Sequence, residues 1–137
     1  MTEKFEFFDK EPAGFSEFTN QEFEEHNISK TGHKTLKYYV HVLENDEIIG
    51  TSQGGMFNSA LYISDFIIKK SYRKSGVGRK LINQIEEHAK KNNCKKIWVD
   101  TYEYQAPDFY KKNGFIEKGR IENYRGKHAK IFFEKKV

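Results

Sequence analysis

Alternation of apolar and polar residues predicts a run of β-structure in the middle of the chain. Leu36–Leu43 is rich in β-branched and aromatic residues, and the polar turn Glu44–Glu47 separates it from a second apolar run, Ile48–Thr51. This arrangement is typical of a β-hairpin. Gly54 and Gly55 then predict a bend or bulge in the second strand.

Ala60–Ile68 predicts a third strand of the same meander. Successive side chains of a strand point to opposite faces, so one face is expected to carry Leu61, Ile63, Asp65 and Ile67, and the other Tyr62, Ser64, Phe66 and Ile68. Asp65 thus alternates with apolar residues. Burying a carboxylate on such a face costs free energy unless the carboxylate is paired, hydrogen-bonded or open to a cleft.

A four-residue period replaces the alternation after Gly76. An amphipathic helix ending near Asn93 is predicted by the recurring apolar residues Val77, Leu81, Ile85 and Ala89. Lys96–Thr101 follows as a strand. Residues 60–101 therefore predict a strand, a helix and a strand in a right-handed parallel crossover.

The two ends of the chain carry weaker patterns. Phe5–Phe8 predicts a short first strand, and an acidic helical stretch is expected around Asn20–His26. A short helix is expected after Pro107, and Phe115–Ile121 with Ala129–Glu134 predict a terminal strand pair. The element order predicts an α/β fold (α+β mixed sheet) of about six to seven mixed strands with flanking helices.

Length and composition fit one folded domain. The chain has 137 residues, and aromatic residues make up 15% of it, enough to build a core. The single cysteine, Cys94, cannot form an internal disulfide, which fits a reducing compartment. There is no long apolar run, and Met1–Asp9 is too acidic and aromatic for a secretory signal. We therefore expect a single domain over residues 1–137, located in the cytoplasm.

Charge is unevenly distributed along the chain. Residues 1–65 hold 5 Lys+Arg against 12 Asp+Glu, whereas residues 66–137 hold 19 against 8. A basic half suggests a polyanionic partner, either a nucleic acid or a phosphate-bearing cofactor. A solvated, lysine-rich surface would give the same count.

The segment Arg73–Lys80 lies between the third strand and the helix, and it combines two glycines with four basic residues. Glycine lets the backbone approach a ligand closely, and the free N–H groups of a helix start favour anions. A phosphate site is therefore predicted, although a flexible turn would have the same composition. A Rossmann fingerprint would need glycine where Leu81 stands, and no Gly-Lys-Ser/Thr of a P-loop occurs.

Two motifs resemble those of the GNAT acetyltransferase superfamily. Arg73–Gly78 is similar to the signature Arg/Gln-x-x-Gly-x-Gly/Ala, and Phe109–Phe115 is similar to the downstream signature aromatic-Tyr-x-x-x-Gly-Phe. The resemblance covers about residues 36–135 and implies the GNAT fold. It also implies that acetyl-CoA is a co-substrate. The cofactor-binding residues then expected are Ile67, Ile68, Arg73, Lys74, Ser75, Gly76, Val77, Gly78, Arg79, Lys80, Gln105 and Phe109.

The resemblance also assigns chemical roles. A backbone N–H at Ile67–Ile68 would meet the thioester carbonyl, and Tyr110 would donate a proton to the leaving thiolate, because a phenol is protonated at neutral pH. An acid at the position of Asp65 lies by the polyamine in the similar strand of spermidine/spermine acetyltransferases. Asp65 is therefore a candidate for binding a cationic amine or for acting as a base.

Glu103 and His128 are competitors for the role of base. Many GNAT members have Asn at the position of Glu103, where it touches the pantetheine arm. No metal site is expected, because no histidine shares metal-ligand spacing with Cys94.

The expected function is transfer of an acetyl group from acetyl-CoA to a primary amine of a small molecule, polyamine-like or another amino compound, by direct attack. Neither a nucleic acid nor a membrane is expected as a partner, and a homodimer is left open. Two alternatives are a basic nucleic-acid-binding module and a CoA-binding protein without turnover.

Overall fold

The computed structural model describes residues 2–137 and divides the chain at Lys34 into two compact units. Each unit is described by itself. The single domain expected over residues 1–137 stays a prediction.

The first unit contains one helix, α1 (Phe15–Thr31), which lies between Gly14 and Gly32, both in the left-handed conformation. Glycine at these positions sets both ends of the helix, and the helix is therefore longer than the stretch expected around Asn20–His26. The strand predicted at Phe5–Phe8 is wrong. These residues have no partner strand and lie exposed, and a single short apolar run cannot form a sheet alone.

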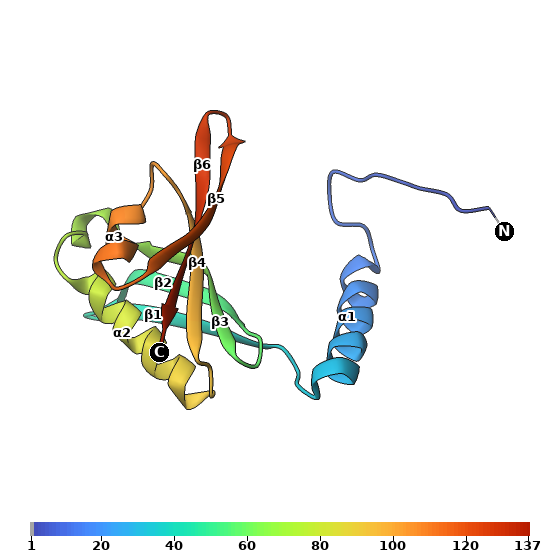
Figure 1. Cartoon of the computed structure of the whole chain (residues 1–137), viewed down its shortest axis with the longest axis horizontal. Helices are drawn as coiled ribbons and strands as arrows, with labels where there is room; N and C mark the ends of the chain where they lie inside the picture. The colour runs from blue at the N-terminus through green and yellow to red at the C-terminus, as the bar shows by residue number, and fades with distance from the viewer. Residues whose placement is uncertain (1) are drawn as a thin grey trace. The chain divides into compact units, whose positions relative to one another are not determined.

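The second unit is built on a six-stranded sheet in the order β1-β2-β3-β4-β6-β5 (Figure 1). β3 and β4 pair in parallel, and every other neighbouring pair is antiparallel. The strands are β1 (Leu36–Glu44), β2 (Glu47–Met56), β3 (Ala60–Ile68), β4 (Lys96–Tyr102), β5 (Ile116–Arg125) and β6 (His128–Lys136). The helical elements are the 3-10 turn η1 (Lys70–Tyr72), α2 (Val77–Lys91) and α3 (Pro107–Lys112). The predicted mixed fold and the parallel crossover are confirmed.

The core of this unit lies between α2 and one face of the sheet. The helix buries the apolar stripe that its four-residue period predicts, with Leu81, Ile85 and Ala89 each 3% exposed or less. Facing strand residues such as Leu61 and Ile97 are fully buried in the same cluster. Burying such side chains contributes about 1.5–3 kcal/mol each, and this packing fixes α2 against β3 and β4.

A bulge in β3 changes which residues share a face. Gln53 pairs with Asp65 whereas Gly54 pairs with Ile63, so Ser64 is an extra residue in β3. An extra residue shifts the alternation of side chains by one position. Ile63 is buried, but Asp65 and Ile67 are exposed. The prediction that Asp65 and Ile67 share a face with Leu61 and Ile63 is therefore wrong.

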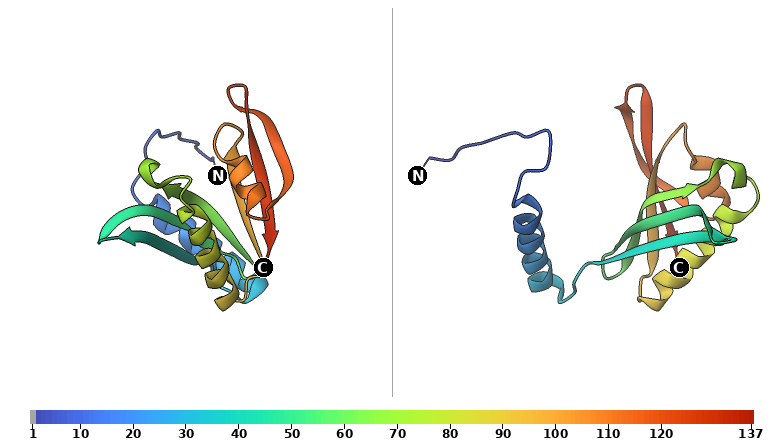
Figure 2. Two further views of the ribbon diagram at one scale, coloured as in Figure 1. Left: turned by 90° about the vertical axis from the view of Figure 1, so that its left-hand side faces the viewer. Right: turned by 180° about the vertical axis from the view of Figure 1, so that it is seen from behind.

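The sheet opens just after this bulge. β3 and β4 pair only over Ala60–Ile63 and Lys96–Val99, although both strands continue for several residues beyond. The left view of Figure 2 shows strands β1–β3 and the β5–β6 hairpin spreading apart toward one end, with α3 near the opening. This divergence leaves one edge of β3 without a neighbouring strand.

Candidate functional site

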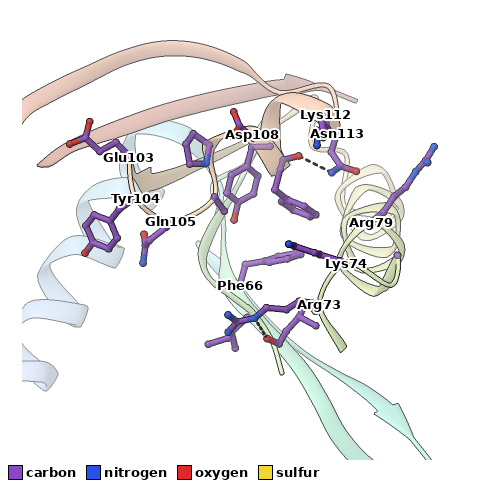
Figure 3. A pocket seen from close by; sticks show the side chains of 18 residues that line it. Phe66, Arg73, Lys74, Arg79, Glu103, Tyr104, Gln105, Asp108, Lys112 and Asn113 are labelled. Atoms are coloured by element: carbon purple, nitrogen blue, oxygen red, sulfur yellow. Dashed lines mark hydrogen bonds between the residues drawn. The ribbon is translucent and has the colours of Figure 1, made fainter. Parts of the chain in front are cut away.

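A pocket of about 1050 Å³ lies where β3 and β4 diverge. Its walls are the end of β3, the glycine loop before α2, and the segment from Glu103 to Asn113 (Figure 3). Pockets of this size accommodate a large organic ligand. Two regions that the sequence motifs singled out, Arg73–Gly78 and Phe109–Phe115, thus meet at one site.

Most of the predicted site residues line this pocket: Ile67, Ile68, Arg73, Lys74, Gly76, Gly78, Arg79, Gln105, Phe109 and Tyr110. Ser75, Val77 and Lys80 do not. The Ser75 hydroxyl donates to the backbone oxygen of Tyr72, so it stabilises the turn before the loop. Val77 and Lys80 line a separate hollow of about 400 Å³ beside β1.

The two positions in the loop require glycine for different physical reasons. Gly76 has φ +89°, which side chains rarely adopt, and a Cβ built there would meet no atom within 4 Å. The space beside it is open to a ligand. A Cβ at Gly78, by contrast, would lie 2.9 Å from the Phe109 ring. Gly78 therefore allows Phe109, a pocket residue, to pack closely against α2.

Basic side chains gather at the loop end of the pocket. Arg73, Lys74 and Arg79 all line it (Figure 3). The Nε–H of Arg73 donates to the backbone oxygen of Ile68 at 2.9 Å, which fastens the loop to the end of β3. Together with the N–H groups at the start of α2, these charges suit a phosphate.

Unpaired backbone donors lie on the edge of β3 that faces the pocket. The Lys69 N–H donates to Ile49 O at 2.8 Å. Because antiparallel ladders alternate, the N–H groups of Phe66 and Ile68 then point away from β2, and that of Ile67 points toward it. Phe66 and Ile68, rather than Ile67, are placed to donate to a ligand carbonyl.

Tyr110 lines the pocket from α3 and is 5% exposed. Its ring packs against four phenylalanines, at centroid distances of 5.3–6.2 Å: Phe66, Phe109, Phe115 and Phe133. Burial, with smaller contributions from Tyr38 and Asp100, raises the pKa of the Tyr110 phenol above its ordinary value. The hydroxyl therefore keeps its proton at neutral pH and can act as a donor.

Asp65 does not line the pocket. Its carboxylate accepts a hydrogen bond from the side chain of Gln53, directly opposite on β2. The bulge at Ser64 turns Asp65 to the face of the sheet opposite Leu61 and Ile63. The role of Asp65 in binding a cationic amine or in acting as a base stays a prediction from the sequence.

Several lining residues were not singled out by the sequence motifs. Tyr104 and Asp108 lie in the segment after β4, and Phe66 lies on β3. Lys112 and Asn113 lie inside the motif Phe109–Phe115, so their position was the available signal. The Asn113 amide donates to Phe109 O at 2.8 Å, which closes the end of α3.

Comparison with known proteins identifies the family of this chain. Residues 3–115 match the sequence model of the acetyltransferase (GNAT) family. The chain belongs to the GNAT acetyltransferase family. This confirms the resemblance found in the two motifs, and it makes acetyl-CoA, the co-substrate of GNAT enzymes, the large ligand that the pocket has to fit.

Three similar proteins illustrate this GNAT membership. Streptothricin acetyltransferase A from Bacillus subtilis (strain 168) is 29% identical over 104 residues, which are 74% of this chain and 58% of that protein. The crystal structure of an acetyltransferase from Bacillus cereus ATCC 14579 has 29% identity and a TM-score of 0.80, covering 96% of this chain and 98% of the other. A protein from Bacillus anthracis str. Ames, assigned as a streptothricin acetyltransferase and solved with acetyl coenzyme A, has 28% identity and a TM-score of 0.68, with coverages of 74% and 62%. This chain therefore spans less than two thirds of the length of both streptothricin acetyltransferases.

The residues that line the pocket of this chain fit acetyl-CoA. The open space beside Gly76 and the basic side chains around it suit the phosphates, and the free edge of β3 can receive the thioester carbonyl. Cys94 lies outside this pocket and is buried, and burial raises the pKa of its thiol.

Within residues 2–137, no helix has the length and apolar content needed to cross a membrane. In the same part of the chain, no three His, Cys, Asp or Glu side chains gather as metal ligands.

Proposed function

We propose that this protein transfers the acetyl group of acetyl-CoA to a primary amine of a small molecule by direct attack. The observation that carries the proposal is the meeting of a basic glycine loop, a free strand edge and the Tyr110 hydroxyl in one pocket. The streptothricin acetyltransferases among the similar proteins act, by name, on streptothricin. For this protein, the proposed acceptor class is a polyamine-like or other amino compound.

The residues divide the chemistry between them. Backbone N–H groups of Phe66 and Ile68 stabilise the negative charge that develops on the carbonyl oxygen. The amine nitrogen forms a bond to the carbonyl carbon, and the carbon–sulfur bond breaks. Tyr110 gives its proton to the departing thiolate, and the nitrogen loses one proton, which restores the tyrosine directly or through water. The products are the amide and CoA.

Direct attack needs no acyl-enzyme. Cys94 is 2% exposed and does not line the pocket, so its thiol is not placed to accept the acetyl group. A cytoplasmic location stays a prediction from the sequence, and a homodimer stays open.

The test is to incubate the protein with acetyl-CoA and a panel of amines, and to follow both CoA release and the acetylated product by mass spectrometry. We expect product with at least one small amine. In a parallel melting experiment, acetyl-CoA at about 100 times its dissociation constant should stabilise the protein by about 2.7 kcal/mol.

The alternatives give different outcomes. Stabilisation by acetyl-CoA with no product from any amine would indicate a CoA-binding protein without turnover. Stabilisation by oligonucleotides but not by acetyl-CoA would indicate a nucleic-acid-binding module and would contradict the proposal.

A further inference from the structure

Two buried hydroxyl groups lie next to the bulge of β3. They belong to Tyr38 on β1, which is 6% exposed, and to Ser52 on β2, which is 3% exposed. The Ser52 hydroxyl donates to the backbone oxygen of Asp65 at 2.7 Å, and the Tyr38 hydroxyl lies 3.1 Å from Ser52 Oγ. A serine hydroxyl has one proton to donate, so Tyr38 has to donate to Ser52. The hydrogen bonds therefore form a chain with one direction, from Tyr38 through Ser52 to the Asp65 carbonyl.

The acceptor at the end of this chain belongs to a peptide group that the proposed reaction uses. The Asp65 carbonyl and the Phe66 N–H are the two ends of one planar, trans peptide group, and they point in opposite directions. The Asp65 oxygen points toward Ser52 on β2, so the Phe66 N–H points away from β2. The hydrogen bond from Ser52 thus orients a backbone donor that is proposed to receive the thioester carbonyl.

The sheet itself gives this peptide group little support. The extra residue Ser64 interrupts the ladder with β2 directly before Asp65, and a bulge disrupts the hydrogen bonds of a ladder locally. On the other side, β4 pairs with β3 only as far as Ile63. Side chains supply the missing support, since the Ser64 hydroxyl also donates to Gln53 O, at 3.1 Å. The orientation of the Phe66 N–H therefore depends on hydroxyl groups as well as on strand pairing.

Gly54 makes room for the outer member of the chain. Tyr38 and Gly54 are partners in the ladder between β1 and β2. A Cβ built at Gly54 would lie 2.9 Å from the Tyr38 ring and 1.8 Å from Tyr62 O, closer than real Cβ atoms come. Glycine at this position therefore lets Tyr38 cross β2 and reach Ser52, its diagonal neighbour.

Such a chain can also strengthen the donor at its end. Hydrogen bonds in series polarise one another, by about 10–30% per bond. In acetyl transfer, negative charge develops on the thioester oxygen as the amine attacks, and a donor that is already oriented stabilises this charge without reorganising. A polarised and fixed Phe66 N–H would thus stabilise the transition state more than the bound substrate.

We propose that Tyr38 and Ser52 are positioning residues for acetyl transfer. They hold the peptide group between Asp65 and Phe66 so that its N–H points at the thioester oxygen and binds it more strongly. The proposal rests on the proposed acetyltransferase function and adds two residues that do not line the pocket. No bond to Tyr38 or Ser52 forms or breaks in the reaction.

The test combines kinetics with infrared spectroscopy of bound acetyl-CoA that carries an isotope label at the thioester carbonyl. A hydrogen bond to a carbonyl oxygen lowers its stretching frequency. Ser52→Ala should raise this frequency and lower kcat by about 10-fold, part of the about 10²–10³-fold that one such donor contributes. KM for the amine and the affinity for acetyl-CoA should stay within about 3-fold. Ser52→Thr keeps the hydroxyl and should restore most of kcat.

Tyr38→Phe keeps the ring and removes only the outer hydroxyl, so it should lower kcat less, by about 2- to 5-fold. This variant also tests the proposal if Ser52→Ala does not fold. Because Tyr38 acts through Ser52, the double variant should be no slower than Ser52→Ala alone. Two losses that simply multiply would overturn the chain.

Tyr62→Phe is the matched control. Tyr62 also lies in the sheet, and its hydroxyl donates to Asp100 at 2.8 Å outside the pocket. The substitution removes a hydroxyl hydrogen bond, so the melting temperature should fall, whereas kcat and the carbonyl frequency should stay unchanged. An equal loss of kcat in Tyr62→Phe and Tyr38→Phe would mean that kcat follows stability, which would overturn the proposal.

Wild-type kcat and carbonyl frequency in both Ser52→Ala and Tyr38→Phe would also overturn it. Absence of turnover by the wild-type protein with every amine would contradict the proposed function instead. In that case the frequency of bound acetyl-CoA decides the question. An upward shift in Ser52→Ala that Ser52→Thr reverses supports the positioning role, and an unchanged frequency overturns it.

Discussion

The two ends of the pocket are built in different ways. The basic end is one continuous segment, Arg73–Arg79, in which a left-handed Gly76 leads directly into α2. The opposite end is assembled from residues far apart in the sequence, since Glu103 on the loop after β4 meets His128 on β6. A site made by one short segment shows itself as a motif, whereas a site assembled across strands depends on how the strands pair. The basic segment suits a ligand with fixed phosphates.

The largest effect should come from blocking the basic end with Gly76→Val. The valine side chain has room, so the fold should survive. Because a residue with a side chain rarely adopts φ +89°, the free energy of unfolding should fall by about 1–2 kcal/mol. The methyl groups would fill the open space beside the loop. Acetyl-CoA binding measured by calorimetry should fall by about 100-fold or more.

Gly126→Val is the matched control for Gly76→Val. Gly126 also has positive φ with no atom near a built Cβ, and it lies in the turn between β5 and β6. The Gly126→Val variant should lose about as much stability as Gly76→Val and keep its affinity for acetyl-CoA. An unchanged affinity in Gly76→Val would contradict the assignment of the loop to the phosphates.

Tyr110→Phe tests the centre of the pocket, between the two ends. The ring and its packing are kept while the transferable proton is removed, so kcat should fall by about 10²–10⁴ with little change in KM for acetyl-CoA. Because burial raises the pKa of Tyr110, the acid stays protonated and should cause no loss of kcat as pH rises from about 7 to 9. Steady-state kinetics across that pH range checks both statements.

The exposed Tyr39 on β1 offers the control substitution, Tyr39→Phe, which should leave kcat unchanged. Wild-type turnover in Tyr110→Phe would reduce Tyr110 to a packing residue.

Arg79→Ala should have a smaller effect at the basic end. Arg79 is exposed and lines the pocket, so its attraction for phosphate is screened by solvent. We expect affinity for acetyl-CoA to fall about 2- to 5-fold at low salt, and the difference from wild type to disappear at high salt. Titration at two salt concentrations measures this. Lys91→Ala, the same charge change at the far end of α2, should show neither effect.

Asp65→Asn should have the smallest effect, because Asp65 faces Gln53 outside the pocket. Asn preserves its size and can still accept from Gln53. Both kinetic constants for the acceptor should stay within about 2-fold of wild type, with a loss of stability below about 1 kcal/mol. A large rise in acceptor KM would return Asp65 to the acceptor site and weaken the comparison between the two ends.

Much of the second unit could be predicted because its signals are local. The apolar stripe of α2 follows from a four-residue period, and the β1–β2 hairpin follows from a polar turn between two apolar runs. The strand predicted at Phe5–Phe8 was wrong, because an apolar run becomes a strand only where a partner strand is available.

The sequence by itself determined three features: family membership, the mixed fold and the basic loop suited to phosphate. Short motifs and the periods of apolar residues are sufficient to indicate each of them. The tertiary structure alone decided three features: the extra residue Ser64 that turns Asp65 away from the face of Leu61 and Ile63, the opening between β3 and β4, and the contact of Glu103 with His128. Each depends on the register between strands that are distant in the chain. Register is set by the pairing of whole strands, so no local pattern of residues contains it.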